Sequence, residues 1–114
     1  MNTPRQLYAI VAALLLTCAL VPASASAAKV GNVDAGKQYA EAQCAACHSI
    51  VPDGNMSPRD AATPFQAIAD TGGMTATALH VFFQTPHPNM PNLIVQGDDE
   101  DNIIAYILSL KSKR

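Results

Sequence analysis

The stretch Cys44-Ala45-Ala46-Cys47-His48, CAACH in one-letter code, holds two cysteines separated by two residues, with a histidine directly after the second. Three kinds of site use cysteines at this spacing: a redox-active dithiol, half of a metal site, and the covalent anchor of a haem. These uses differ in the fold that surrounds the pair and in the compartment where they occur. The rest of the sequence therefore has to decide between them.

The size and composition of the chain indicate one small domain. It has 114 residues with no Trp, three Phe and three Tyr, so a large aromatic core is excluded. Small domains of this kind usually draw part of their stability from disulfides, a metal or a cofactor. The formal net charge of −2 lacks the strongly basic balance typical of nucleic-acid binding, so we expect no nucleic-acid partner.

Residues 1–27 have the features of a secretory signal peptide. A short basic start precedes an uncharged apolar run, Ala9–Val21, and small residues follow that run. Cleavage after Ala27 is preferred, and cleavage after Ala25 also fits the A-x-A pattern. The alternative, an uncleaved membrane anchor, needs about 20 apolar residues, which is longer than this run. We therefore expect residues 28–114 to form the mature domain.

Export to the periplasm changes what the cysteines can do. Removal of residues 1–27 removes Arg5 and Cys18, which leaves a formal net charge of −3 and two cysteines, Cys44 and Cys47. Lipid attachment at Cys18 is disfavoured because this residue lies inside the apolar run. Free thiols tend to be oxidised in an exported protein. Either the two remaining cysteines form a local disulfide, or something else occupies both sulfurs.

The mature chain has the pattern of an all-α protein with three to five helices. No segment alternates apolar and polar residues with the period of a strand. The first helix, Ala35–Cys44, runs directly into CAACH. The expected helix starts, taken from capping residues and prolines, are Asp34, Pro64, Thr75 and Asp98. Apolar spacing in the last helix predicts a buried stripe, formed by Ile103, Ile104, Ile107 and Leu108.

This helical pattern decides between the three uses of CAACH. A redox dithiol belongs beside a βαβ unit, and no strand is predicted before Cys44. A zinc site needs four ligands, so His80 or His87 would have to join three ligands from CAACH, where adjacent Cys47 and His48 rarely bind one metal. In a c-type haem site the two thiols form thioethers with the porphyrin, and the histidine that follows them binds the iron. Haem attachment on the exported side agrees with the signal peptide, so we expect one covalent haem c.

The sixth ligand of the haem iron is expected to be Met90. This residue lies in a proline-rich stretch, residues 87–92, just before the last helix, and proline keeps such a stretch from becoming helical. A loop of this kind can cross the open face of the haem and hold a thioether on the iron. Four other residues are competing candidates: Met56, Met74, His80 and His87.

Together these motifs resemble a small class I cytochrome c of bacterial type. The resemblance covers nearly all of residues 32–112. It rests on Gly36-Lys37-Gln38-Tyr39-Ala40, CAACH, the Pro-x-Met-Pro loop around Met90, and Ile103–Leu110. It implies a cytochrome c fold of three or four helices around the haem. It also implies that the first and last helices cross at Gly36 near Tyr106.

The resemblance further implies the surroundings of the iron. His48 and Met90 would be its axial ligands, and a proline carbonyl, from Pro58 or else from Pro64, would orient the histidine and fix its tautomer. Arg59 is a candidate partner for a haem propionate. We expect the haem to lie among apolar side chains, namely Phe65, Ile68, Leu79, Phe82 and Leu93.

Filled axial positions leave no vacant site for a substrate, so we expect a periplasmic one-electron carrier and not an enzyme. Thioether ligation and apolar surroundings both favour ferrous iron, which predicts a positive potential. The expected partners are redox proteins that donate or accept electrons, and no membrane span is expected after signal cleavage. Two alternatives remain: a dedicated cytochrome subunit of a dehydrogenase or oxidase complex, and a gas-binding or peroxidatic haem protein with an open sixth site.

Overall fold

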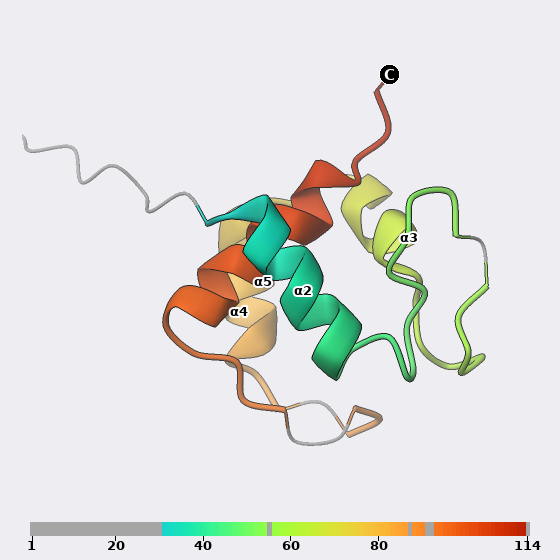
Figure 1. Ribbon diagram of the computed structural model, residues 1–114, viewed down its shortest axis with the longest axis horizontal. Helices are drawn as coiled ribbons and strands as arrows, with labels where there is room; N and C mark the ends of the chain where they lie inside the picture. The colour runs from blue at the N-terminus through green and yellow to red at the C-terminus, as the bar shows by residue number, and fades with distance from the viewer. Residues whose placement is uncertain (1–30, 55, 87, 91–92, 114) are drawn as a thin grey trace, which may run out of the picture.

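The structure, a computed structural model, describes residues 31–54, 56–86, 88–90 and 93–113. The predicted signal peptide and the competing ligand His87 lie outside these ranges. Within them the chain forms helices and no strand, which confirms the expected all-α class. The helices are α2 Val33–Gln43, α3 Phe65–Asp70, α4 Ala76–Phe83 and α5 Asp98–Ser109 (Figure 1). Among the described residues we find no helix with the length and apolarity that a membrane span requires.

Helix α2 begins at Val33, two residues before the predicted start, because Asn32 caps the helix instead of Asp34. The side-chain oxygen of Asn32 accepts a hydrogen bond from the Ala35 N–H at 2.9 Å. The Asn32 N–H in turn donates to Oδ1 of Asn102 on α5 at 2.7 Å. A contact with a residue 70 positions away therefore fixes the start of α2.

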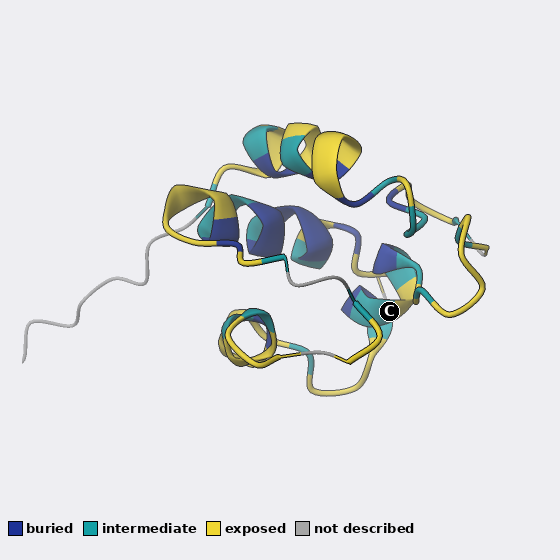
Figure 2. Cartoon of the chain, turned by 90° about the horizontal axis from the view of Figure 1, so that it is seen from below, coloured by how far each residue is buried: buried dark blue, intermediate teal, exposed yellow. Residues whose placement is uncertain are grey.

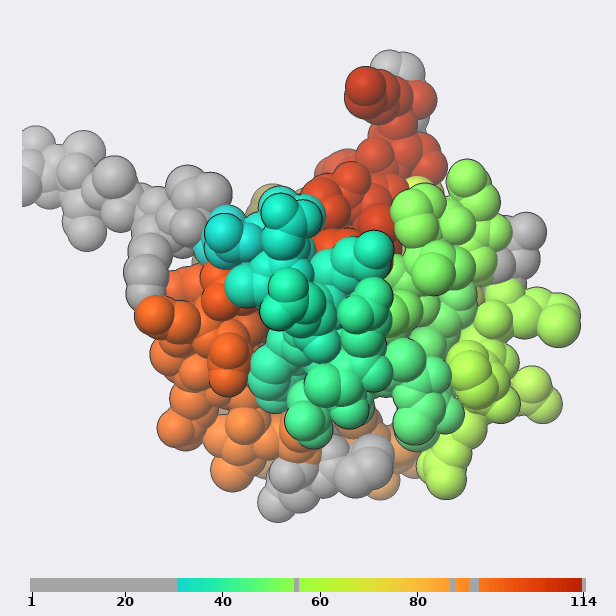
Figure 3. Space-filling model, in the orientation of Figure 1, coloured from blue at the N-terminus to red at the C-terminus, as the bar shows by residue number. Residues whose placement is uncertain are grey.

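Helices α2 and α5 cross closely at Gly36. A Cβ atom at this position would lie 2.8 Å from Cβ of Tyr106 and closer still to the carbonyl oxygen of Asn102. Either contact would force the two backbones apart, so the crossing requires glycine. Figure 1 shows α2 in front of α5, and in the space-filling view α2 forms the centre of that face of the molecule (Figure 3).

We expect Gly36→Ala to lower the free energy of unfolding by about 1–3 kcal/mol, the usual cost of an over-packed contact. Gly72→Ala is the matched control, because a Cβ atom there meets nothing within 4 Å. The control should change stability by less than about 1 kcal/mol. Urea unfolding followed by far-ultraviolet circular dichroism measures both values. Equal urea midpoints for the two variants would contradict this prediction. They would mean that the crossing of α2 and α5 accommodates a Cβ atom at position 36 without loss of stability.

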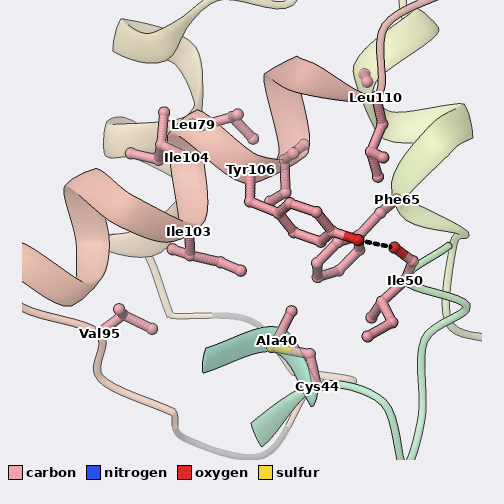
Figure 4. Packing of buried hydrophobic residues seen from close by; sticks show 12 residues of the cluster. Ala40, Cys44, Ile50, Phe65, Leu79, Val95, Ile103, Ile104, Tyr106 and Leu110 are labelled. Carbon is pink, nitrogen blue, oxygen red and sulfur yellow. Dashed lines mark hydrogen bonds between the residues drawn. The ribbon is translucent and has the colours of Figure 1, made fainter. Parts of the chain in front are cut away.

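The core lies along α5, between α2 and α4. Figure 2 shows the buried residues concentrated on α5, with α2 on one side and α4 on the other. In the predicted stripe, Ile103, Ile104 and Ile107 are buried, and Leu108 packs against them partly buried. The remaining buried apolar residues come from all four helices and from the segments that join them: Ala40, Cys44, Ile50, Phe65, Ala69, Leu79, Val95, Tyr106 and Leu110 (Figure 4).

The two short helices begin close to their predicted positions. Thr75 caps α4 as expected, and its hydroxyl oxygen accepts a hydrogen bond from the Ala78 N–H at 3.2 Å. Pro64 was predicted as the first residue of α3, but it is the N-cap, and α3 begins at Phe65. The Phe65 N–H donates to the carbonyl of Ser49 at 2.9 Å, so the start of α3 is tied to the segment that follows CAACH.

Tyr106 connects α5 to this same segment. Its hydroxyl donates a 2.7 Å hydrogen bond to the carbonyl oxygen of Ile50, and both residues are buried (Figure 4). Burial, with a smaller contribution from the negative charge of Glu41, raises the pKa of Tyr106 above its ordinary value. The hydroxyl therefore keeps its proton and remains a donor well into the alkaline range.

Replacing Tyr106 by Phe should lower the free energy of unfolding by about 1–3 kcal/mol, because the buried Ile50 carbonyl loses its donor. Tyr39→Phe serves as the control, since it removes the same hydroxyl group from a tyrosine that is only partly buried. Urea midpoints of the two variants give the comparison. The Tyr106–Ile50 bond is not a source of stability if both variants lose the same amount.

Candidate functional site

CAACH forms a turn at the C-terminal end of α2. Cys44 is the C-cap of the helix, and its N–H donates to the carbonyl of Ala40 at 2.9 Å. The Cys44 carbonyl then accepts the N–H groups of Cys47 and His48, at 3.0 Å and 2.9 Å. Both cysteines are free thiols, Cys44 buried and Cys47 partly exposed. One carbonyl thus fixes the turn that carries the two sulfurs and the imidazole.

The imidazole of His48 is held in one tautomer by the backbone. Nδ1 lies 2.7 Å from the carbonyl oxygen of Thr63, and a carbonyl can only accept, so Nδ1 carries the proton. Nε2 then keeps its lone pair and is the nitrogen available to a metal ion. The Phe65 ring packs against the imidazole with a centroid distance of 5.4 Å and a tilt of 48°. These contacts fix the ring orientation from two sides.

The predicted source of this carbonyl is wrong. Neither Pro58 nor Pro64 supplies it, because the acceptor belongs to Thr63, the residue before Pro64. A residue before proline is disfavoured in the helical conformation, and α3 begins only at Phe65. The Thr63 carbonyl therefore lies outside the helix, where it accepts the imidazole proton.

Backbone contacts hold the segment between CAACH and α3 around His48. The N–H of Arg59 donates to the carbonyl of Cys47 at 3.1 Å, and the N–H of Ser49 donates to the hydroxyl oxygen of Ser57 at 3.0 Å. Together with the hydrogen bond from the Phe65 N–H to the Ser49 carbonyl, these contacts tie the start of the loop to its middle and its end. The Thr63 carbonyl is thus presented by a loop that several hydrogen bonds keep in place.

A cavity of about 720 Å³ brings the four predicted site residues together. Cys44, Cys47, His48 and Met90 all line it, although Met90 is 42 residues beyond His48 in the chain. The volume falls within the range of about 300–1,000 Å³ that is typical of ligand and cofactor sites. All the apolar residues expected around the cofactor line the same cavity: Phe65, Ile68, Leu79, Phe82 and Leu93.

The competing axial ligands lie in different surroundings. Met56 is 86% exposed in the loop between α2 and α3, whereas Met74 lines the cavity. His80 faces α5, where Nδ1 lies 3.0 Å from a carboxylate oxygen of Glu100. Two methionines, Met74 and Met90, therefore border the space next to His48.

The Cys44 thiol is a buried part of the cavity wall. Burial, together with the nearby charge of Cys47, raises the pKa of the Cys44 thiol to about 11. This environment disfavours a negatively charged thiolate and suits a neutral sulfur. Arg59, the candidate propionate partner, also lines the cavity and places a positive charge at its wall.

One group of the site, the backbone carbonyl of Thr63, was not predicted from the sequence. The Thr63 carbonyl leaves no side-chain pattern, although the Thr-Pro pair marks a residue whose backbone is kept out of a helix. Met74, one of the competing ligand candidates, follows the Gly72-Gly73 pair. Gly73 has a φ of +78°, so the chain turns sharply there and brings Met74 to the cavity wall.

Among the described residues, no group of three or more His, Cys, Asp or Glu is arranged to hold a metal ion. No protein-family model, curated protein or solved structure matches the chain.

Proposed function

We propose that this chain is a monohaem c-type cytochrome that carries single electrons between redox proteins in the periplasm. The observation that carries this proposal is the cavity in which the CAACH turn, Met90 and an apolar wall meet. A redox dithiol needs neither the neighbouring histidine nor such a cavity. The resemblance to small class I cytochromes c accounts for both.

The residues of the cavity suit a covalently bound haem. The thiols of Cys44 and Cys47 would each add across one vinyl group of the porphyrin, which converts them into thioethers. Burial raises the pKa of the Cys44 thiol to about 11 because it disfavours a charged sulfur. A thioether carries no charge, so this penalty does not apply to it. His48 would supply Nε2 and Met90 its sulfur as the axial ligands, and Arg59 would face a propionate.

When bound, the haem supplies an iron centre that changes between ferric and ferrous states by one electron. The surrounding protein sets the potential at which this change occurs. The Thr63 carbonyl orients the imidazole of His48 and makes it a stronger donor. The apolar wall would disfavour the additional positive charge of the ferric state, and the thioether of Met90 would favour the ferrous state. A positive potential follows from these last two effects.

Voltammetry of the exported, haem-loaded protein tests this function. We expect one reversible one-electron wave at a positive potential against the standard hydrogen electrode. The ferric spectrum should contain a Met–iron charge-transfer band, and carbon monoxide should leave the ferrous spectrum unchanged because both axial positions are filled. Immediate binding of carbon monoxide would instead indicate an open sixth site and a gas-binding or peroxidatic protein.

A further inference from the structure

His80 on α4 lies between two carboxylates of α5. Its Nδ1 is 3.0 Å from Oε1 of Glu100, and its Nε2 is 3.5 Å from Oδ1 of Asp101. The Glu100 side chain is only 9% exposed, whereas the His80 side chain is 38% exposed. A buried carboxylate needs a hydrogen-bond donor, and His80 supplies one from the neighbouring helix.

This contact joins the two ends of the segment that contains Met90. Helix α4 ends at Phe83 and α5 begins at Asp98, so His80 and Glu100 lie one turn inside the helices on either side of the connection. Glu100 and Met90 also line one further cavity, of about 480 Å³. The His80–Glu100 contact therefore lies at the base of the segment that contains Met90, and Glu100 shares a cavity wall with Met90.

Among the described residues, the charged groups near His80 are carboxylates of α5. Helix α4 contains no Asp, Glu, Lys or Arg, and its packing partner within the described helices is α5. The α5 groups facing His80 are the carboxylates of Glu100 and Asp101. Removing the imidazole would leave the Glu100 carboxylate buried without this donor, which is strongly unfavourable. We expect the start of α5 to move away from the end of α4, so that water can reach the Glu100 carboxylate. This separation also loosens the segment between the two helices.

We propose that His80 is a positioning residue that keeps Met90 on the iron by holding the first turn of α5 against α4. This inference rests on the proposed haem ligation. If the His80 contact is lost, a larger fraction of the protein should have Met90 detached from the iron. An external ligand can bind only that population, so its apparent affinity rises in proportion to the population.

Titration of the ferric holoprotein with imidazole, followed by optical spectroscopy, tests the proposal. We expect His80→Ala to bind imidazole at least about tenfold more tightly than the parent protein. In urea, it should lose the Met–iron band well before the helical circular dichroism signal. His80→Gln retains a side-chain donor for Glu100 and should stay within about threefold of the parent. Val81→Ala, at a neighbouring exposed position, should match the parent.

An imidazole affinity of His80→Ala within about threefold of the parent would overturn the proposal. So would loss of the Met–iron band and of helical structure at the same urea concentration. If His80→Ala does not fold, Glu100→Ala replaces it: this variant removes the carboxylate that His80 contacts, so the first turn of α5 is no longer held against α4. It should bind imidazole more tightly than the parent, and parent-like affinity would overturn the proposal. A parent protein without a Met–iron band would refute the ligation by Met90 itself, before any variant is compared.

Discussion

Met90→Leu holoprotein should lose the Met–iron charge-transfer band, and its potential should fall by on the order of 0.1–0.3 V, a part of the roughly 0.8 V range that axial ligands set. Leucine keeps the volume of the side chain but removes the sulfur, so the covalent haem and the helical fold should remain. Without the thioether the ferrous state loses its soft ligand, which is why the potential falls. Optical spectroscopy of the ferric protein and voltammetry measure the two effects.

Met74→Leu is the matched control, because Met74 lines the same cavity and the substitution removes the same sulfur. We expect this variant to keep the charge-transfer band and to shift the potential by less than about 0.1 V, since Met74 would act as a wall residue and not as a ligand. The opposite pattern, with the band lost in Met74→Leu and kept in Met90→Leu, would assign the sixth ligand to Met74. If both variants keep the charge-transfer band, neither methionine is the sixth ligand.

The double variant Cys44→Ser with Cys47→Ser should yield no covalent haem and a largely unfolded polypeptide. An empty cavity of about 720 Å³ would cost up to about 17 kcal/mol at roughly 24 cal/mol per Å³. The cavity is partly open, so the real cost is smaller, but about half of that figure already matches the 5–15 kcal/mol of a typical domain. We therefore expect the proposed cofactor to decide whether this small chain folds.

Haem-staining gels and far-ultraviolet circular dichroism of the purified variant measure both outcomes. Cys18→Ala is the control, because it changes the third cysteine, which the predicted cleavage after Ala27 removes. The control should mature like the parent. A double serine variant with the full helical signal of the parent would mean that the apoprotein folds by itself and that the haem is not required for stability.

Local sequence signals located most of the helices. Thr75 and Asp98 mark the starts of α4 and α5, because a capping hydroxyl and an acidic first turn act within a few residues of the helix end. Apolar spacing likewise identified the residues of α5 that are buried. The start of α2 was predicted two residues late, because Asn32 and Asp34 are both residue types that cap helices. The hydrogen bond from the Asn32 N–H to Asn102, 70 positions away in the chain, favours Asn32.

In the candidate site, too, some residues have a local sequence signal and others depend on contacts between distant parts of the chain. The CAACH motif is contiguous, and Met90 was recognisable from the prolines around it. The Thr63 carbonyl, by contrast, acts through the backbone across 15 positions, and the contact of His80 with Glu100 spans 20. Such pairs depend on how the helices pack, which no local pattern records. Gly36 was placed at the helix crossing through the family resemblance, and the close approach of Asn102 and Tyr106 gives the physical reason.

The intact mass of the exported protein, with its optical spectrum, tests the proposed function most directly. We predict a chain that begins at Ala28, heavier than its polypeptide by one haem, and a reduced spectrum of the c type. A colourless protein with the mass of its amino acids alone, produced in cells that attach haem to other exported proteins, would contradict the covalent haem and with it the electron-carrier function.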